Sequence, residues 1–263
     1  MNARIATAIL GLPVLTASIW WGTPWFSLLL GAGGILGGRE FYRLASHAGV
    51  KPWIYLGFAG IASLIIGAHF EENICFFIIT AWIIISLTLT LIRGKNFESW
   101  AWTLLGILYL GWLLSYYILL REGDMGREWV LLTIFSVIAY DTGAFFVGRT
   151  WGRHFMAQGI SPQKTWEGVA GGITFAVVLA LVLSSMFNLY SEALPLGTAQ
   201  IIFLAILISI FSQLGDLAES WLKRKARVKD SGNLLPGHGG ILDRIDSWIP
   251  VAIVVYFYVK WTV

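Results

Sequence analysis

Long apolar runs set the limits on what this chain can fold into. A helix that crosses the hydrocarbon core of a bilayer needs about 20 mainly apolar residues. Because a spanning segment must satisfy its backbone hydrogen bonds internally, we predict an all-α fold, a polytopic transmembrane helical bundle of about nine spans. The candidate spans are residues 5–21, 25–37, 53–68, 74–92, 100–120, 129–148, 168–187, 199–222 and 243–262.

The composition agrees with a membrane protein. Of the 263 residues, 57% are hydrophobic and 13% are charged, and the mean hydropathy is +0.73, which lies outside the usual range of soluble domains. A net charge of +3, without a soluble segment to carry it, predicts no nucleic-acid partner. Cys75 is the single cysteine, so the chain can form no internal disulfide. With no internal repeat, residues 1–263 are expected to form a single integral membrane domain.

Basic residues are distributed unevenly between the two sets of loops. If there are nine spans, 15 of the 18 lysines and arginines fall on the side of the N-terminus, and the other side carries Arg121, Arg127 and Lys260. By the positive-inside rule the N-terminus is cytoplasmic. We therefore expect a protein of the inner (cytoplasmic) membrane whose larger loops face the cytoplasm.

Two acids inside apolar spans are candidates for a functional site. Asp141 lies about seven residues, or ~10 Å, from the cytoplasmic end of its span. Asp216, Ser220 and Lys223 are spaced i, i+4 and i+7 and so share one helix face. Charged groups within spans usually face the bundle interior or a water-filled cavity. The alternatives are a structural hydrogen bond or ion pair for Asp141 and an ordinary interfacial helix end for the stripe.

The start of the last span combines glycines with carboxylates. Gly239 and Gly240 directly precede a run in which Asp243 and Asp246 lie one turn apart. Glycines let a backbone approach a phosphate, and helix N-terminal amides bind anions. Paired carboxylates suit a hard cation such as Mg²⁺. Each feature alone fits simple capping or a flexible loop, but beside Asp216 they predict a site for a metal and phosphates.

The loop after the sixth span offers further phosphate ligands. Ser161 followed by Pro162 predicts a helix start, which would place Lys164 and Thr165 near exposed amides that favour phosphate. A purely structural loop is an equal alternative from these residues alone.

Basic residues and a histidine complete the candidate set. Lys223 and Arg224 are assigned to substrate phosphates, and Lys229 lies in the same basic cluster. Topology and anionic lipid headgroups are the alternative reason for that cluster. His238 could act as a general acid or base, but phosphoryl-type transfer needs mainly positioning and charge neutralisation, which favours phosphate binding.

The run from residue 220 to 246 resembles the signature of phosphatidate cytidylyltransferases, the CDP-diglyceride synthases. Residues 141–144 and 161–168 resemble two further segments of the family, so the strongest resemblance covers 139–168 and 216–247. The N-terminal half agrees only in being a set of spans with a short basic start. The signature positions matched are Ser220, Lys223, Arg224, Lys229, Asp230, Gly232, Pro236, His238, Gly239, Gly240, Asp243, Arg244 and Asp246.

The resemblance implies an enzyme that transfers CMP from CTP to phosphatidate, giving CDP-diacylglycerol and pyrophosphate in phospholipid biosynthesis. It also implies a homodimer, Mg²⁺ with K⁺ as an optional second ion, and a cleft open to the cytoplasm and to membrane lipids. Metal ligands would be Asp216 and Asp243, sharing one ion, with Asp141 in support. Catalytic roles would fall to Lys223, Arg224, His238 and Asp246, and substrate binding to Ser220, Lys164, Thr165, Lys229, Gly239 and Gly240.

Two other classes of protein share parts of this pattern. Another CTP-dependent lipid transferase or a lipid kinase would use the same metal and phosphate chemistry. An ion or proton transporter would also bury Asp141 and Asp216, but it should carry acids along a path to both faces, and the outer halves of the predicted spans have none.

Overall fold

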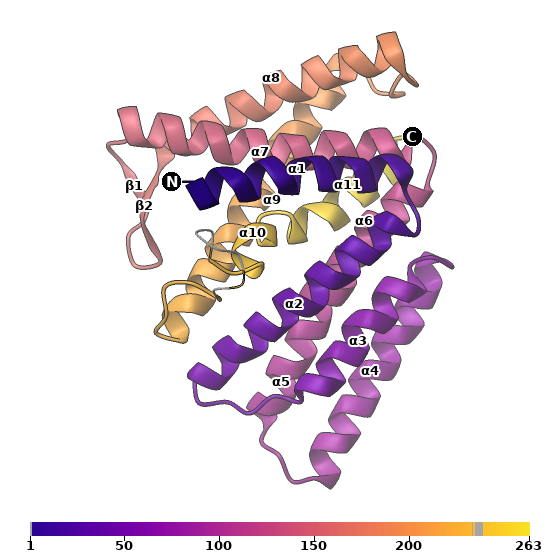
Figure 1. Ribbon diagram of the computed structural model, residues 1–263, viewed down its shortest axis with the longest axis vertical. Coiled ribbons are helices and arrows are strands. Elements are labelled where there is room, and N and C mark those ends of the chain that lie inside the picture. The colour runs from indigo at the N-terminus through magenta and orange to yellow at the C-terminus, as the bar shows by residue number, and fades with distance from the viewer. Residues whose placement is uncertain (1, 233, 235–238) are drawn as a thin grey trace. The chain divides into compact units, whose positions relative to one another are not determined.

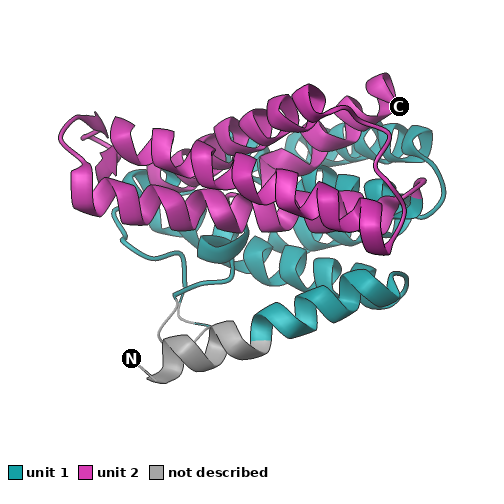
Figure 2. Ribbon diagram, turned by 90° about the horizontal axis from the view of Figure 1, so that it is seen from above, with its two compact units in different colours: residues 1–122, 222–245 teal, residues 123–221, 246–263 magenta. Residues whose placement is uncertain are grey.

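The computed structural model describes residues 2–232, 234 and 239–263, without the side chains of residues 2–10. Over these residues the chain is helical except for loops and one short β-hairpin (Figure 1). It forms two compact units, coloured separately in Figure 2. Unit 1 comprises residues 1–122 and 222–245, and unit 2 comprises residues 123–221 and 246–263.

Unit 1 contains the N-terminal helices and a short C-terminal one. A π-helical stretch, Ile107–Trp112, joins two of these helices into a single 26-residue helix. The buried Tyr42 lies at the centre of the packing, and its hydroxyl donates a hydrogen bond to the carbonyl of Thr103 at 3.0 Å. The helices are α1 (Asn2–Trp21), α2 (Trp25–His47), α3 (Ile54–Gly67), α4 (Glu72–Ile92), α5 (Phe97–Gly106), α6 (Leu113–Glu122) and α10 (Leu242–Ile245).

Unit 2 is organised by a close helix pair, α7 and α8, which lie side by side in Figure 1. Glycines make this approach possible: a Cβ at Gly171 would clash with Val147, and one at Gly172 would lie 2.7 Å from the ring of Tyr140. Small residues let membrane helices pack closely in this way. The elements are α7 (Gly126–Trp151), β1 (Phe155–Ala157), β2 (Ser161–Thr165), α8 (Trp166–Tyr190), α9 (Thr198–Lys225, which ends in unit 1) and α11 (Ile249–Thr262).

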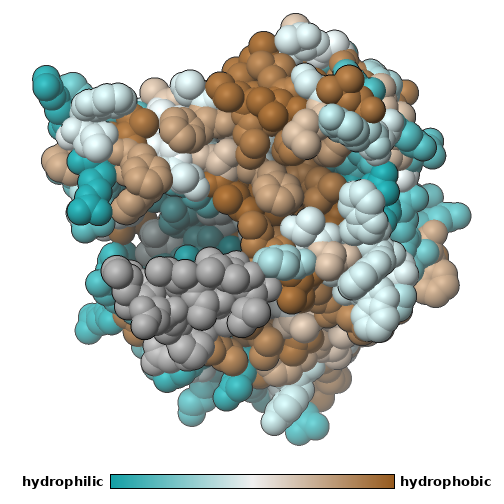
Figure 3. All heavy atoms as spheres, turned by 45° about the horizontal axis from the view of Figure 1, so that its top comes forward, coloured by the Kyte–Doolittle hydropathy of each residue, from teal (hydrophilic) through white to brown (hydrophobic). Residues whose placement is uncertain are grey.

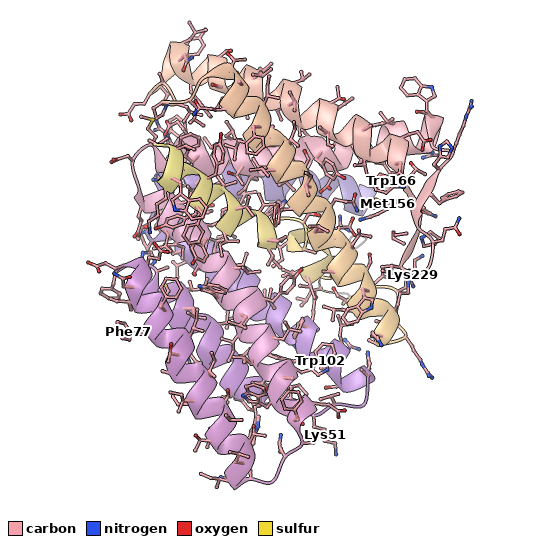
Figure 4. All side chains as sticks on the ribbon, turned by 180° about the vertical axis from the view of Figure 1, so that it is seen from behind. Lys51, Phe77, Trp102, Met156, Trp166 and Lys229 are labelled. Atoms are coloured by element: carbon pink, nitrogen blue, oxygen red, sulfur yellow. The ribbon has the colours of Figure 1, made fainter. Side chains whose placement is uncertain are left out.

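Five helical segments of the described chain are long and apolar enough to cross a membrane. Large apolar side chains are exposed on them, as on the face in Figure 3, and Phe77 of α4 points away from its helix (Figure 4) and is 76% exposed. This is the surface of an integral membrane protein, which confirms the predicted helical membrane fold. The count of nine spans and the cytoplasmic N-terminus stay predictions. The qualifying segments are residues 72–92, 97–122, 126–151, 166–190 and 198–225.

The last predicted span, 243–262, is not one helix. The short α10 ends at Ile245, and α11 begins only at Ile249, with Pro250 in its first turn. Proline has no backbone N–H and disfavours helical geometry in the residue before it, so a helix starts at this point more readily than it continues through it. Asp246 therefore lies in the turn between two helices and does not open the span with Asp243.

Two other sequence-based boundaries were wrong. The predicted helix start at Ser161–Pro162 is strand β2, which pairs antiparallel with β1, so the fold is nearly but not entirely α-helical. The helix begins at Trp166, because Thr165 has extended backbone and its side chain caps the helix. The second predicted span ended at residue 37, whereas α2 continues to His47 and includes Glu40.

The glycine seam between α7 and α8 gives a stability prediction. We expect Gly171→Val to overpack the seam against Val147 and to destabilise unit 2 by about 1–3 kcal/mol, seen as a lower apparent melting temperature of the detergent-solubilised protein. Ala170→Val, at an exposed position of the same helix, is the control and should leave the melting temperature nearly unchanged. Equal melting temperatures for the two variants would contradict the close packing.

Candidate active site

Unit 2 brings Lys164 and Asp216 together. The Lys164 Nζ lies 2.6 Å from the Asp216 Oδ2, and Ser220, one turn further along α9, donates its hydroxyl to Asp216 Oδ1 at 3.3 Å. Strand β2 delivers the lysine, because its last residue, Thr165, is fixed as the cap of α8. The pair therefore joins residues from two of the segments that the sequence singled out.

A tyrosine–glutamine hydrogen bond links the helices that carry Asp141 and Asp216. The hydroxyl of Tyr140, the residue before Asp141 on α7, donates to the side-chain carbonyl of Gln213 at 2.7 Å, and Gln213 precedes Asp216 by three residues on α9. Sequence reasoning missed Tyr140 and Gln213, although both directly neighbour candidate residues or lie one turn from them. This hydrogen bond connects α7 and α9 next to the two candidate acids.

The base of the β-hairpin is held by Glu167. Its Oε2 accepts the backbone N–H groups of Arg153 and His154 at 3.1 and 3.2 Å, and its Oε1 contacts the His154 imidazole. Thr165, predicted to bind phosphate, is 5% exposed and accepts the N–H of Gly168 at 3.2 Å. In this structure Thr165 therefore caps the N-terminus of α8 and positions the neighbouring Lys164.

Unit 1 contains a second lysine–aspartate pair. Lys223 Nζ donates to Asp243 Oδ1 at 2.7 Å, and the side chains are 13% and 9% exposed. The other oxygen, Oδ2, accepts the N–H of Ser231 at 3.1 Å, its hydroxyl at 2.9 Å and the N–H of Gly240 at 2.8 Å. Charge-assisted hydrogen bonds of this kind hold a carboxylate in one orientation.

Gly239 and Gly240, which precede Asp243, both lie against its carboxylate. Gly239 has a φ of +81°, which only glycine adopts readily, and a Cβ there would lie 2.9 Å from Asp243 Oδ2. The N–H of Gly240, assigned from sequence to a phosphate, instead donates to Asp243. The glycines therefore shape the loop around the aspartate in the absence of substrate.

Glu40 is the acidic residue that sequence reasoning missed. It is 3% exposed on α2, and its Oε2 accepts the N–H of Leu242 at 2.8 Å and the hydroxyl of Ser231 at 3.1 Å. The available signal was an acid two residues after the Gly37–Gly38 pair. Ending the predicted span at residue 37 assigned this acid to a loop.

The remaining predicted residues occupy different environments. Arg224 and Lys229 are exposed, the latter labelled in Figure 4. Asp246 belongs to unit 2, is 6% exposed and accepts the N–H of Ser247 at 2.7 Å. His238 lies outside the described residues.

Comparison with known proteins identifies the family. A sequence profile of the cytidylyltransferase family matches residues 2–262. The chain belongs to the cytidylyltransferase family. It is 33% identical to the phosphatidate cytidylyltransferase of Haemophilus influenzae over 98% of this chain and 99% of that protein. It is 32% identical to the chloroplastic phosphatidate cytidylyltransferase 4 of Arabidopsis thaliana over 95% of this chain and 71% of that protein.

Some relatives match over a shorter length. The phosphatidate cytidylyltransferase of Bacillus subtilis is 40% identical, but the match covers 66% of this chain and 64% of that protein. The chain thus spans a little less than two thirds of that bacterial relative.

The side chains of this cytidylyltransferase-family protein suit the Mg²⁺ that the resemblance implies. Glu40 and Asp243 share the hydroxyl of Ser231, and Asp216 lies beside Lys164 and Ser220. Among the described residues no three acidic, histidine or cysteine side chains form a ready-made metal cage. Mg²⁺ is usually held by one or two carboxylates together with substrate phosphates, so carboxylate pairs are the donor set that such an ion needs.

The Lys223–Asp243 pair can be tested by a double-mutant cycle. We expect Lys223→Met to lower the apparent melting temperature because it leaves a mostly buried carboxylate without this cation. Adding Asp243→Asn should reverse part of that loss, with a coupling energy of about 0.5–3 kcal/mol. Lys225→Met, on an exposed position of the same helix end, is the control. Additive effects of the two changes would show that the pair contributes nothing.

Proposed function

We propose that this protein transfers CMP from CTP to phosphatidate, producing CDP-diacylglycerol and pyrophosphate. The observation that carries the proposal is the pair of lysine–aspartate contacts, Lys164–Asp216 and Lys223–Asp243, at 2.6 and 2.7 Å. All four residues come from the segments that resemble phosphatidate cytidylyltransferases, and relatives with that name align with the chain. Carboxylates and lysines set side by side are the groups that a phosphate-transfer site requires.

The reaction needs no nucleophile from the protein. A phosphate oxygen of phosphatidate attacks the α-phosphorus of CTP, forming a new P–O bond, while the bond from that phosphorus to the bridging oxygen breaks and pyrophosphate carries away the electron pair. The protein's part is to position two anionic substrates and to neutralise the charge on the transferring and leaving oxygens.

The lysines are held ready for this neutralisation. Lys164 and Lys223 are each held by an aspartate, and each can exchange that carboxylate for a phosphate oxygen when substrate binds. Asp216 with Asp141, and Asp243, would hold Mg²⁺, with K⁺ as an optional second ion. When bound, the metal neutralises charge that develops on the phosphate oxygens. Ser220, one turn from Asp216, keeps that carboxylate oriented.

The location follows from the substrates and the charge distribution. Phosphatidate keeps its acyl chains in the bilayer, so the site would lie at headgroup depth. The excess of basic residues on the N-terminal side supports a site on the cytoplasmic face of the inner membrane. We propose a homodimer, because the family resemblance implies one.

The products separate this function from its alternatives. We expect the purified protein, given α-³²P-labelled CTP, phosphatidate and Mg²⁺, to release unlabelled pyrophosphate and to form a labelled lipid that co-migrates with CDP-diacylglycerol. A lipid kinase using the same nucleotide would release labelled CDP and leave the lipid unlabelled. An ion transporter would form neither product, and either outcome would refute the proposal.

The aspartate assignment predicts a selective loss of activity. We expect Asp216→Asn and Asp243→Asn each to lower kcat by at least about 100-fold at saturating Mg²⁺, because each removes a charged ligand for metal and phosphate. Asp124→Asn, an exposed acid between α6 and α7, should keep wild-type kcat. Near-normal turnover in either of the first two variants, measured at several Mg²⁺ concentrations, would show that the assignment is wrong.

A further inference from the structure

Glu40, near the other end of the chain, contacts the two ends of the signature loop, which are described at residues 231–232 and 239–242. It precedes Ser231 by 191 residues and Leu242 by 202, and it lies on α2, which packs against α10 within unit 1. Gly37, one turn earlier on α2, leaves room for this contact, since a Cβ there would lie 3.3 Å from Ile245. The carboxylate is thereby inserted among residues that the sequence marks as functional.

One oxygen of Glu40 binds both ends of the loop. Its Oε2 accepts the N–H of Leu242 at 2.8 Å and lies 3.1 Å from the hydroxyl of Ser231. Burying a carboxylate in an apolar bundle is unfavourable unless donors compensate for the lost water. The favourable position for this charge is therefore the one in which Ser231 and Leu242 are both held against it.

The Ser231 hydroxyl links Glu40 to the candidate site residues Asp243 and Lys223. The Ser231 hydroxyl lies 2.9 Å from Asp243 Oδ2 as well, and Asp243 binds Lys223 through its other oxygen. A hydroxyl has one hydrogen, so it donates to Glu40 or to Asp243 at any moment. Glu40, Ser231, Asp243 and Lys223 thus form one continuous set of polar contacts across α2, the loop, α10 and the end of α9.

Two signature glycines are explained by Glu40. A Cβ at Gly232 would occupy the position of the Glu40 carboxylate, and a Cβ at Gly240 would meet both that carboxylate and the Ser231 hydroxyl. Neither glycine has the positive φ that would by itself require glycine. The described ends of the loop, at Gly232 and Gly240, therefore fit closely around this side chain.

We propose that Glu40 is a positioning residue of the transfer site. By holding Ser231 and the start of α10 at Leu242, it fixes the groups that surround Asp243, and through Asp243 it fixes Lys223. Glu40 lies outside the signature and acts through other residues without touching substrate. The claim about loop order stands independently of the reaction, whereas its consequence for catalysis rests on the proposed function.

Amide hydrogen exchange of the detergent-solubilised protein measures how well this region is ordered. Mass spectrometry gives the exchange rate of the peptide that covers residues 230–247. We expect Glu40→Ala to speed exchange in this peptide by about tenfold or more, because the acceptor for Leu242 is lost. Glu40→Gln keeps a carbonyl oxygen for both donors and should stay within about threefold of wild type. Ser231→Ala, which removes one of the two contacts with little change in volume, should lie between them.

A matched control separates loop order from general destabilisation. Glu128 on α7 is also 3% exposed, and its carboxylate is held by Arg127 and Ser191. Glu128→Gln should leave exchange in the 230–247 peptide unchanged. Unchanged exchange in Glu40→Ala would overturn the proposal. So would exchange that rises equally in α3 and α4, which would indicate loss of stability throughout unit 1.

Kinetics test the consequence for catalysis. We expect kcat/KM for CTP to fall about 10–100-fold in Glu40→Ala, the range found when a supporting contact of a reactive group is removed, and to return to within about threefold in Glu40→Gln. A Gln variant as impaired as the Ala variant would mean that the negative charge is required, which overturns a positioning role. If wild type makes no CDP-lipid but the exchange pattern is as expected, the proposed function fails and the role of Glu40 in the loop stands.

Discussion

The arrangement of this protein depends on how an apolar bundle accommodates carboxylates. An ionised carboxyl group in such surroundings is stable only where cations or hydrogen-bond donors replace water. Unit 2 meets this requirement at Asp216 with Lys164 and Ser220, and unit 1 meets it at Asp243 with Lys223, Ser231 and Gly240. Helix ends, the β-hairpin and the glycine-rich loop are placed so that these donors converge.

Sequence alone predicted the helical membrane fold and the residues that form the two ion pairs. Apolar runs of spanning length persist regardless of tertiary packing, so periodicity and length identify them reliably. The i, i+4 spacing of Asp216 and Ser220 is a local property of one helix, and the two side chains are in contact as expected. The site assignments themselves stay predictions, because contacts show where residues lie and not what they bind.

What sequence could not supply were interactions between distant segments. Glu40 lies beyond the apolar run that defined its span, and its partners are about 200 residues away, so no local pattern predicts which residues it contacts. Strand β2 forms only because residues 155–157 pair with it, which a serine–proline helix signal cannot reveal. The break before α11 was readable at Pro250, because a proline starts a helix more readily than a helix continues through it.

The close fit of Gly232 and Gly240 around Glu40 affects how mutational scans of this protein should be interpreted. A side chain at either glycine displaces the carboxylate before it can alter any contact with a ligand. If substitutions at these two glycines abolish activity, the reason would therefore be a steric clash with Glu40, and the loss would not by itself show that the glycines bind a ligand. Substitutions in the loop are therefore best scanned twice, once in the wild-type protein and once in a variant with the shorter acid aspartate at position 40.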